Sequence, residues 1–188
     1  MFRFAIIVLI IHNIGGILMN LGIVLFPSKE LQDKVNEYRM RYDAHFALIP
    51  PHITIKDEFE IDPADKDKVI DYVKNVAKNH SPVEVAIKKV SSFEPTSHVI
   101  YFKVNKNDEI VALYEALNDG DFYGVNKHPF VPHFTIGQKF SSVQEHDDVY
   151  STLNMVGIEH TEVIDEITLC KREDDGEWKV LESFKLEK

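Results

Sequence analysis

The sequence predicts an α+β protein of two similar lobes, in which two antiparallel or mixed sheets flank a central cleft and carry helices on their outer faces. One observation is a repeated motif, since PPHITIK begins at Pro50 and VPHFTIG begins at Val131. The other is the order of the elements, because strand, helix, histidine-bearing strand, helix and strand follow one another twice along the chain. Each repeat is therefore expected to supply one lobe, and the helix-free sheet faces are expected to meet across the cleft.

The first repeat opens with a buried strand and an amphipathic helix. The strand is expected over residues 21–26, which read LGIVLF. Ser28 is a suitable N-cap for the following helix, which is expected to end near Asp43. Leu31, Val35 and Tyr38 would form the buried face of this helix, because they recur at helical spacing.

The rest of the first repeat contains the first histidine-bearing strand, a helix and a further strand. The strand covers residues 52–56 and follows two prolines. Pro63 is expected at the start of the second helix, where a missing amide hydrogen costs nothing. Residues 83–89 then alternate apolar and polar side chains, which predicts a half-buried strand.

The second repeat has the same order and ends in an additional hairpin. A strand, a helix, the second histidine-bearing strand and a helix are expected at residues 99–104, 108–117, 133–137 and 143–153. Residues 161–173 and 178–187 then read as two strands joined by a turn at Asp174, Asp175 and Gly176.

Composition limits the class of protein. A length of 188 residues suits one compact domain or a domain of two small lobes. The net charge of −10 argues against a sequence-independent grip on long nucleic acid, which requires many lysines and arginines. The single cysteine, Cys170, excludes an internal disulfide and reads as a small buried hydrophobe in a strand. A reducing cytoplasm is the location that fits best.

The first eighteen residues form an apolar leader with three interpretations. A signal peptide needs a small-residue cleavage site, which is missing here. A membrane anchor needs about 20 apolar residues, and His12, Asn13 and two glycines interrupt this segment. We favour a translation start at Met19, because two adjacent glycine codons can spell a ribosome-binding sequence. Residues 19–188 would then form the domain, and no stable membrane association is expected.

The repeated motif places a histidine and a threonine on one face of each strand. Residues i and i+2 of a strand point the same way, so His52 joins Thr54 and His133 joins Thr135. The intervening isoleucines and phenylalanine point to the opposite face and pack under helices. If the two lobes face each other, the two imidazoles and two hydroxyls converge on one cavity.

Two histidines supply what phosphoryl transfer needs without a metal. An imidazole titrates near pH 6.5, so at neutral pH one ring can take a proton while its protonated partner gives one to the leaving oxygen. The threonine hydroxyls can donate hydrogen bonds to the non-bridging phosphoryl oxygens. Which of His52 and His133 is the base stays open.

The paired His-x-Thr strands resemble the 2H phosphoesterase superfamily, which includes 2′-5′ RNA ligases and cyclic phosphodiesterases. From Met19 onward the chain is similar to the small bacterial phosphoesterases of that superfamily, including FPSKELQDKVNEYRMRYD and FVPHFTIG. The resemblance implies a bilobal fold and metal-independent action on 2′,3′-cyclic or 2′-5′ phosphodiesters, with no cofactor. It also implies catalytic roles for His52, Thr54, His133 and Thr135. The expected substrate is a nucleotide or a short RNA end.

Other side chains are weaker candidates for contacts with a substrate. Lys56 follows Thr54 by two residues, so it would either hold a phosphate in the cleft or lie solvated beside a helix. Tyr101 is a candidate for stacking on a base, and Arg39 or Arg41 for reaching a terminal phosphate. The remaining conspicuous side chains read as surface, capping or core-edge residues: His45, His80, His98, His128, His146, His160 and Trp178.

Two alternative functions use the same residues. A binding module could keep the cleft to sense or sequester a phosphorylated nucleotide without turning it over. A two-histidine metal hydrolase would be inhibited by EDTA, but few carboxylates accompany the motifs. The sequence does not predict the oligomeric state.

Overall fold

The computed structural model describes residues 18–188, so the leader predicted for residues 1–18 lies outside the described part except for Leu18. The helices and strands, with a short 3-10 helix η1, are β1 (Met19–Leu25), α1 (Lys29–Tyr42), β2 (Ile53–Ile61), η1 (Pro63–Asp65), α2 (Lys66–Lys78), β3 (Val83–Ser92), β4 (Ile100–Val104), α3 (Asp108–Leu117), β5 (His133–Gly137), α4 (Val143–Leu153), β6 (His160–Ile164), β7 (Glu166–Arg172) and β8 (Trp178–Lys185). In residues 18–188, every helix is too short or too polar to cross a bilayer.

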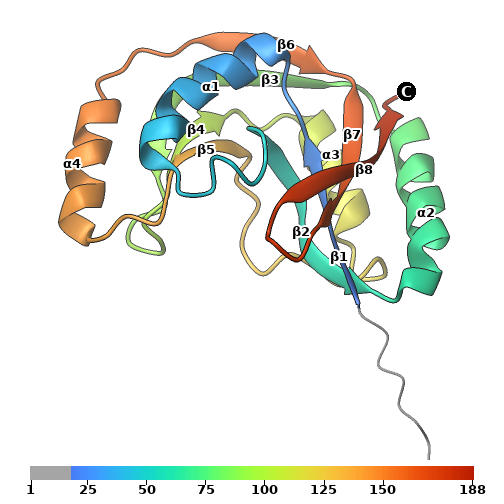
Figure 1. Cartoon of the computed structure of the whole chain (residues 1–188). Coiled ribbons are helices and arrows are strands. Elements are labelled where there is room, and N and C mark those ends of the chain that lie inside the picture. The colour runs from blue at the N-terminus through green and yellow to red at the C-terminus, as the bar shows by residue number, and fades with distance from the viewer. Residues whose placement is uncertain (1–17) are drawn as a thin grey trace, which may run out of the picture.

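Two four-stranded sheets form the framework. Their strand orders are β2-β1-β7-β8, the first sheet, and β5-β4-β3-β6, the second sheet. Every pairing within them is antiparallel, which confirms the predicted fold class and selects antiparallel over mixed sheets. Helix α2 packs on the first sheet, α1 and α4 pack on the second, and α3 contacts β2 of the first sheet and β3 of the second. Helices α2 and α4 lie at opposite sides of the molecule (Figure 1).

The two repeats exchange elements, so the expectation of one repeat per lobe is wrong. Strand β3 from the first repeat lies between β4 and β6, and β7 from the second half lies between β1 and β8. Helix α1 packs against β5, and α3 packs against β2. Each lobe therefore contains elements from both halves of the chain.

Most element boundaries follow the local signals in the sequence. Ser28 caps α1 by accepting a hydrogen bond from the Leu31 amide, and Asp43 ends the helix as expected. Pro63 begins a 3-10 turn, and the α-helix itself starts at Lys66. The single strand expected over 161–173 is instead divided at Asp165, because β6 pairs in the second sheet and β7 in the first.

Strand periodicity orients the histidines. Ile53 and Ile55 in β2 are fully buried, as are Phe134 and Ile136 in β5. Each such side chain contributes roughly 1.5–3 kcal/mol when removed from water. A register slip of one residue would exchange these side chains with the polar ones, so the core holds the His-x-Thr face toward the other side of each sheet.

Candidate active site

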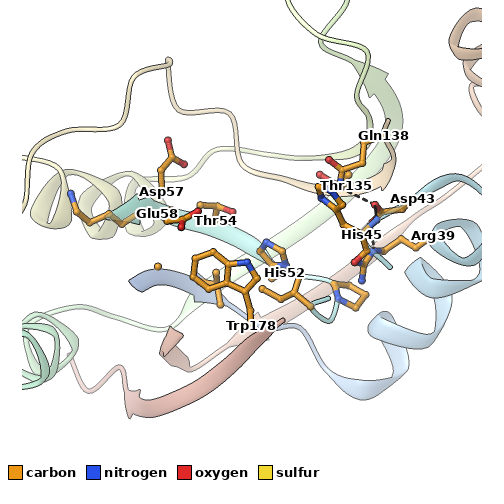
Figure 2. A pocket seen from close by; sticks show the side chains of 15 residues that line it. Arg39, Asp43, His45, His52, Thr54, Asp57, Glu58, Thr135, Gln138 and Trp178 are labelled. Atoms are coloured by element: carbon orange, nitrogen blue, oxygen red, sulfur yellow. Dashed lines mark hydrogen bonds and ion pairs between the residues drawn. The ribbon is translucent and has the colours of Figure 1, made fainter. Parts of the chain in front are cut away.

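A cleft with a volume of about 400 Å³ lies where the two sheets face each other. Its lining comes from β1, β2, β5 and β8, together with the last turn of α1 and the segments that follow α1 and β5. His52 and Thr54 contribute from the β2 side and Thr135 from β5 (Figure 2). The cavity is therefore lined by both residues of the first His-x-Thr motif and by Thr135 of the second, whereas His133 lies outside its lining.

Both histidines are anchored by the same hydrogen bond. The Nδ1 atom of His52 lies 2.8 Å from the carbonyl oxygen of Pro50, and Nδ1 of His133 lies 2.7 Å from that of Val131. A carbonyl oxygen only accepts, so each Nδ1 carries the proton and donates it. In the neutral ring, Nε2 is then an unprotonated acceptor, which is the state a general base requires.

Burial depresses the basicity of both rings. The largest effect on His52 is desolvation, and it lowers the pKa to about 4 although the hydrogen bond to Pro50 acts in the opposite sense. The positive charge of Arg39 and that of a protonated His133 lower the pKa of His52 further. Burial also lowers the pKa of His133, partly offset by its hydrogen bond to Val131. Without substrate, both rings therefore favour the neutral form at pH 7, in contrast to the expected mixed pair.

His133 lies in an aromatic setting that includes Tyr101. The centroids of the Tyr101 and His133 rings are 5.0 Å apart, and Phe93 is also 5.0 Å from His133. Tyr101 is buried and stacks on Phe93 at 4.2 Å. Tyr101 is therefore positioned to support the ring of His133. These contacts cover much of the Tyr101 ring, so they argue against its predicted stacking on a substrate base.

Lys56 lines the cleft, but its ammonium group is already engaged. Nζ donates to the carbonyl oxygens of Leu117 at 2.9 Å and Gly124 at 2.7 Å, and the side chain is 2% exposed. Leu117 is the last residue of α3, whose carbonyl end attracts a cation. Lys56 is thus neither solvated nor free, and these bonds tie β2 to the end of α3 and its following loop.

A buried ion pair lies beside His52 in the cleft wall. Nε of Arg39 donates to Asp43 at 2.7 Å, with side-chain exposures of 3% and 1%. The same carboxylate accepts a hydrogen bond from the side-chain amide of Gln138 at 2.9 Å (Figure 2). This bond links the end of α1 to the segment after β5. Arg39, one of the two predicted arginines, therefore lines the cleft, and Arg41 is exposed.

Trp178 is a cleft residue that sequence reasoning missed. It was expected at the core edge, but it lines the cleft at the start of β8. A side chain at Gly22 would place its Cβ 3.0 Å from the Trp178 ring, so glycine permits the indole to approach β1 closely. Glycine inside a strand often marks such a close approach, and this was the available signal.

His146 was expected to be a surface or capping residue, and the structure corrects this. His146 is 1% exposed and does not lie on the surface. Its Nε2 lies 2.8 Å from the Ser92 hydroxyl and its Nδ1 lies 2.9 Å from the Asp147 carboxylate. Two partners on opposite ring atoms explain its burial, because each polar group is satisfied. His45 lines the cleft as well. Throughout residues 18–188, His, Cys, Asp and Glu side chains form no group of three suited to a metal ion.

The structure confirms that Cys170 is a small buried residue of a strand, as expected. The side chain is 1% exposed within the first sheet. Burial raises the pKa of its thiol to about 12, so the reactive thiolate is scarcely populated at neutral pH. Cys170 is therefore part of the packing and not a nucleophile.

Comparisons with known sequences converge on one family. A family model described as the 2′-5′ RNA ligase superfamily matches residues 27–176. A Staphylococcus epidermidis protein named "Putative phosphoesterase" is 48% identical over 169 residues, which cover 89% of this chain and 99% of that protein. A relative from Staphylococcus aureus strain JH1 has the same identity and coverage.

Solved structures share the fold. LigT of Escherichia coli complexed with 3′-AMP aligns with a TM-score of 0.67 at 12% identity, covering 91% of this chain and 99% of that chain. A protein from Thermus thermophilus aligns with a TM-score of 0.66 at 19% identity, covering 90% and 98%. At such identities the likeness supports the bilobal architecture.

Proposed function

Because the chain belongs to the 2′-5′ RNA ligase superfamily, among the 2H phosphoesterases, we propose that it hydrolyses a 2′,3′-cyclic or 2′-5′ phosphodiester of a nucleotide or RNA end without a metal. The observation that carries this proposal is the pair of imidazoles, each anchored through Nδ1 to a backbone carbonyl. Both Nε2 atoms are thereby left for proton transfer. His52, Thr54, His133 and Thr135 are the proposed catalytic groups.

The charges around the rings support an assignment of roles. Burial first, and then the positive charge of Arg39, lower the pKa of His52 to about 4, although the Asp43 carboxylate acts in the opposite sense. The neutral form is thereby favoured, which makes His52 the proposed base. For a 2′,3′-cyclic phosphate, water attacks phosphorus and gives a proton to Nε2 of His52. The bond from phosphorus to the 3′ oxygen breaks, and protonated His133 gives its Nε2 proton to that oxygen. The product is a 2′-phosphate, and proton exchange with solvent restores both rings.

The remaining groups would hold the substrate. Hydroxyls of Thr54 and Thr135 can donate to the non-bridging oxygens, where negative charge develops. Trp178 offers a flat surface on which a base can stack. LigT of Escherichia coli has been solved in complexes with 3′-AMP, ATP, NADP⁺ and phosphate, and nucleotides of this kind suit a cleft of about 400 Å³.

We expect the protein to open 2′,3′-cyclic nucleotides in the presence of EDTA. The reason is that two imidazoles supply both proton transfers, so removal of divalent ions leaves the reaction intact. Product formation is followed by liquid chromatography with several cyclic nucleotides and cyclic-phosphate-ended RNA. Activity abolished by EDTA would favour the metal hydrolase. Quenching of Trp178 fluorescence by nucleotides without turnover would favour the binding module.

The pH profile of kcat/KM should be a bell with its maximum below pH 6.5. Activity needs neutral His52, so it falls on the acid side near its pKa of about 4. Activity also needs protonated His133, whose pKa is lowered by burial, so the alkaline fall begins below about 6.5. The alkaline fall of kcat should occur at a higher pH than that of kcat/KM, because a bound phosphate anion favours the imidazolium form of His133. A maximum of kcat/KM above pH 8 would contradict these roles.

A further inference from the structure

A row of cationic side chains extends from His133 across the second sheet. Lys103 of β4 is the direct partner of His133 in β5, and Lys89 of β3 is the direct partner of Lys103. Directly opposite residues of antiparallel strands project from the same face. Thr135 shares the His133 face of β5 and lines the cleft, so the two lysines lie on the cleft-facing side of the second sheet. Both are exposed and lie beyond the residues that line the cavity itself.

A β-bulge is what brings Lys89 onto this face. The pairing runs from Ile87 with Val104 directly to Lys89 with Lys103, so Lys88 is the extra residue. Without the bulge, alternation would direct Lys89 to the opposite, helix-covered face. Bulges commonly re-aim a side chain beside a functional site.

The arrangement is unfavourable unless an anion binds there. Like charges directly opposite each other destabilise a sheet. Among residues 18–188, no carboxylate oxygen lies within 4.0 Å of either ammonium, although the chain carries 31 acidic residues against 21 basic ones. The first lobe differs in what lies beside its histidine. The neighbour of His52 is the aromatic ring of Phe26, with ring centroids 6.3 Å apart, and not a lysine.

We propose that Lys89 and Lys103 form a subsite for a second phosphate, next to the phosphate that reacts at His133. This inference rests on the proposed function and adds a substrate class, namely nucleotides that carry another phosphate beyond the reacting one. Strands lie about 4.8 Å apart, so the row spans roughly 10 Å. A flexible lysine at either position can reach a phosphate within that span. The second phosphate is either the internal diester of an oligonucleotide or a 5′-phosphate on a mononucleotide.

Binding tests the subsite without requiring turnover. Trp178 is the single tryptophan, so its fluorescence reports titration with adenosine 3′,5′-bisphosphate and with 3′-AMP. The wild-type protein should bind the bisphosphate at least about tenfold more tightly. Lys89→Gln and Lys103→Gln should each remove most of this difference while leaving 3′-AMP affinity within about twofold. Lys78→Gln on α2 is the control, as an exposed lysine outside the cleft.

Kinetics then distinguish the two sources of the second phosphate. kcat/KM is compared for a nucleoside 2′,3′-cyclic phosphate, its 5′-phosphorylated form and a dinucleotide that ends in the cyclic phosphate. A lysine-dependent preference for the dinucleotide assigns the subsite to an oligonucleotide, and one for the 5′-phosphorylated form assigns it to a mononucleotide. Equal affinities for the two binding probes in the wild-type protein, or equal losses for both in the variants, would overturn the subsite. Absence of all turnover would instead count against the proposed function.

Stability measurements separate this role from a structural one. Each lysine variant removes a like-charge contact, so its melting temperature should equal or exceed that of the wild-type protein. A lower melting temperature, together with weaker binding of both probes, would mean that the lysines support the sheet and form no phosphate subsite.

Discussion

Replacement of His52 or His133 with alanine is expected to lower turnover of a 2′,3′-cyclic nucleotide at least about a hundredfold. Each ring is proposed to make one proton transfer in the reaction, so each variant would lack either the general base or the general acid. Initial rates with purified variants in EDTA measure the loss. Nucleotide affinity, read from Trp178 fluorescence, should change far less, because the loss concerns the reaction step and not the cleft.

A matched control is available on the outside of the molecule. His80 has the same kind of anchor, with Nδ1 2.7 Å from the carbonyl oxygen of Val76 at the end of α2. His80→Ala should keep wild-type turnover, because this ring does not line the cleft. Near-wild-type activity in either His52→Ala or His133→Ala would remove the two-histidine mechanism.

The sequence predicted the parts of the site that depend on local periodicity. Alternation along a strand places His52 with Thr54 and His133 with Thr135, because each apolar neighbour must enter the core. The duplication then implied that two such faces meet. The helix bounds near Ser28 and Asp43 also followed from short-range capping, which needs no knowledge of the tertiary structure.

The features that escaped prediction depend on contacts between distant segments. The exchange of β3 and β7 between sheets has no local signal, since both sheets accept an apolar strand. Lys56 follows the expected alternation of β2, yet the carbonyls that capture it come from the end of α3 and the loop behind it. The bulge at Lys88 likewise appears only once the register between β3 and β4 is known.

Replacement of Asp43 with alanine should cause the largest loss of stability among the cleft residues. Removal of the carboxylate leaves the buried guanidinium of Arg39 without its charged partner and removes the acceptor of the Gln138 amide. Breaking a buried ion pair from one side costs about 3–5 kcal/mol. For a chain of this size, that corresponds to a fall of roughly 6–20 °C in Tm, measured by differential scanning calorimetry.

Helix α1 provides the comparison for this prediction. Lys29 and Asp33 form an ion pair at the same spacing, but their side chains are 78% and 62% exposed. Asp33→Ala should therefore shift Tm by no more than about 2 °C, because an exposed pair is screened by water. The double variant Arg39→Met with Asp43→Leu should recover much of the stability lost by Asp43→Ala, since no unpaired charge stays buried. Equal small shifts in Tm for Asp43→Ala and Asp33→Ala would mean that the buried pair of Arg39 and Asp43 contributes no more to stability than an exposed pair. The stability of the cleft wall beside His52 would then come from the packing of the surrounding core.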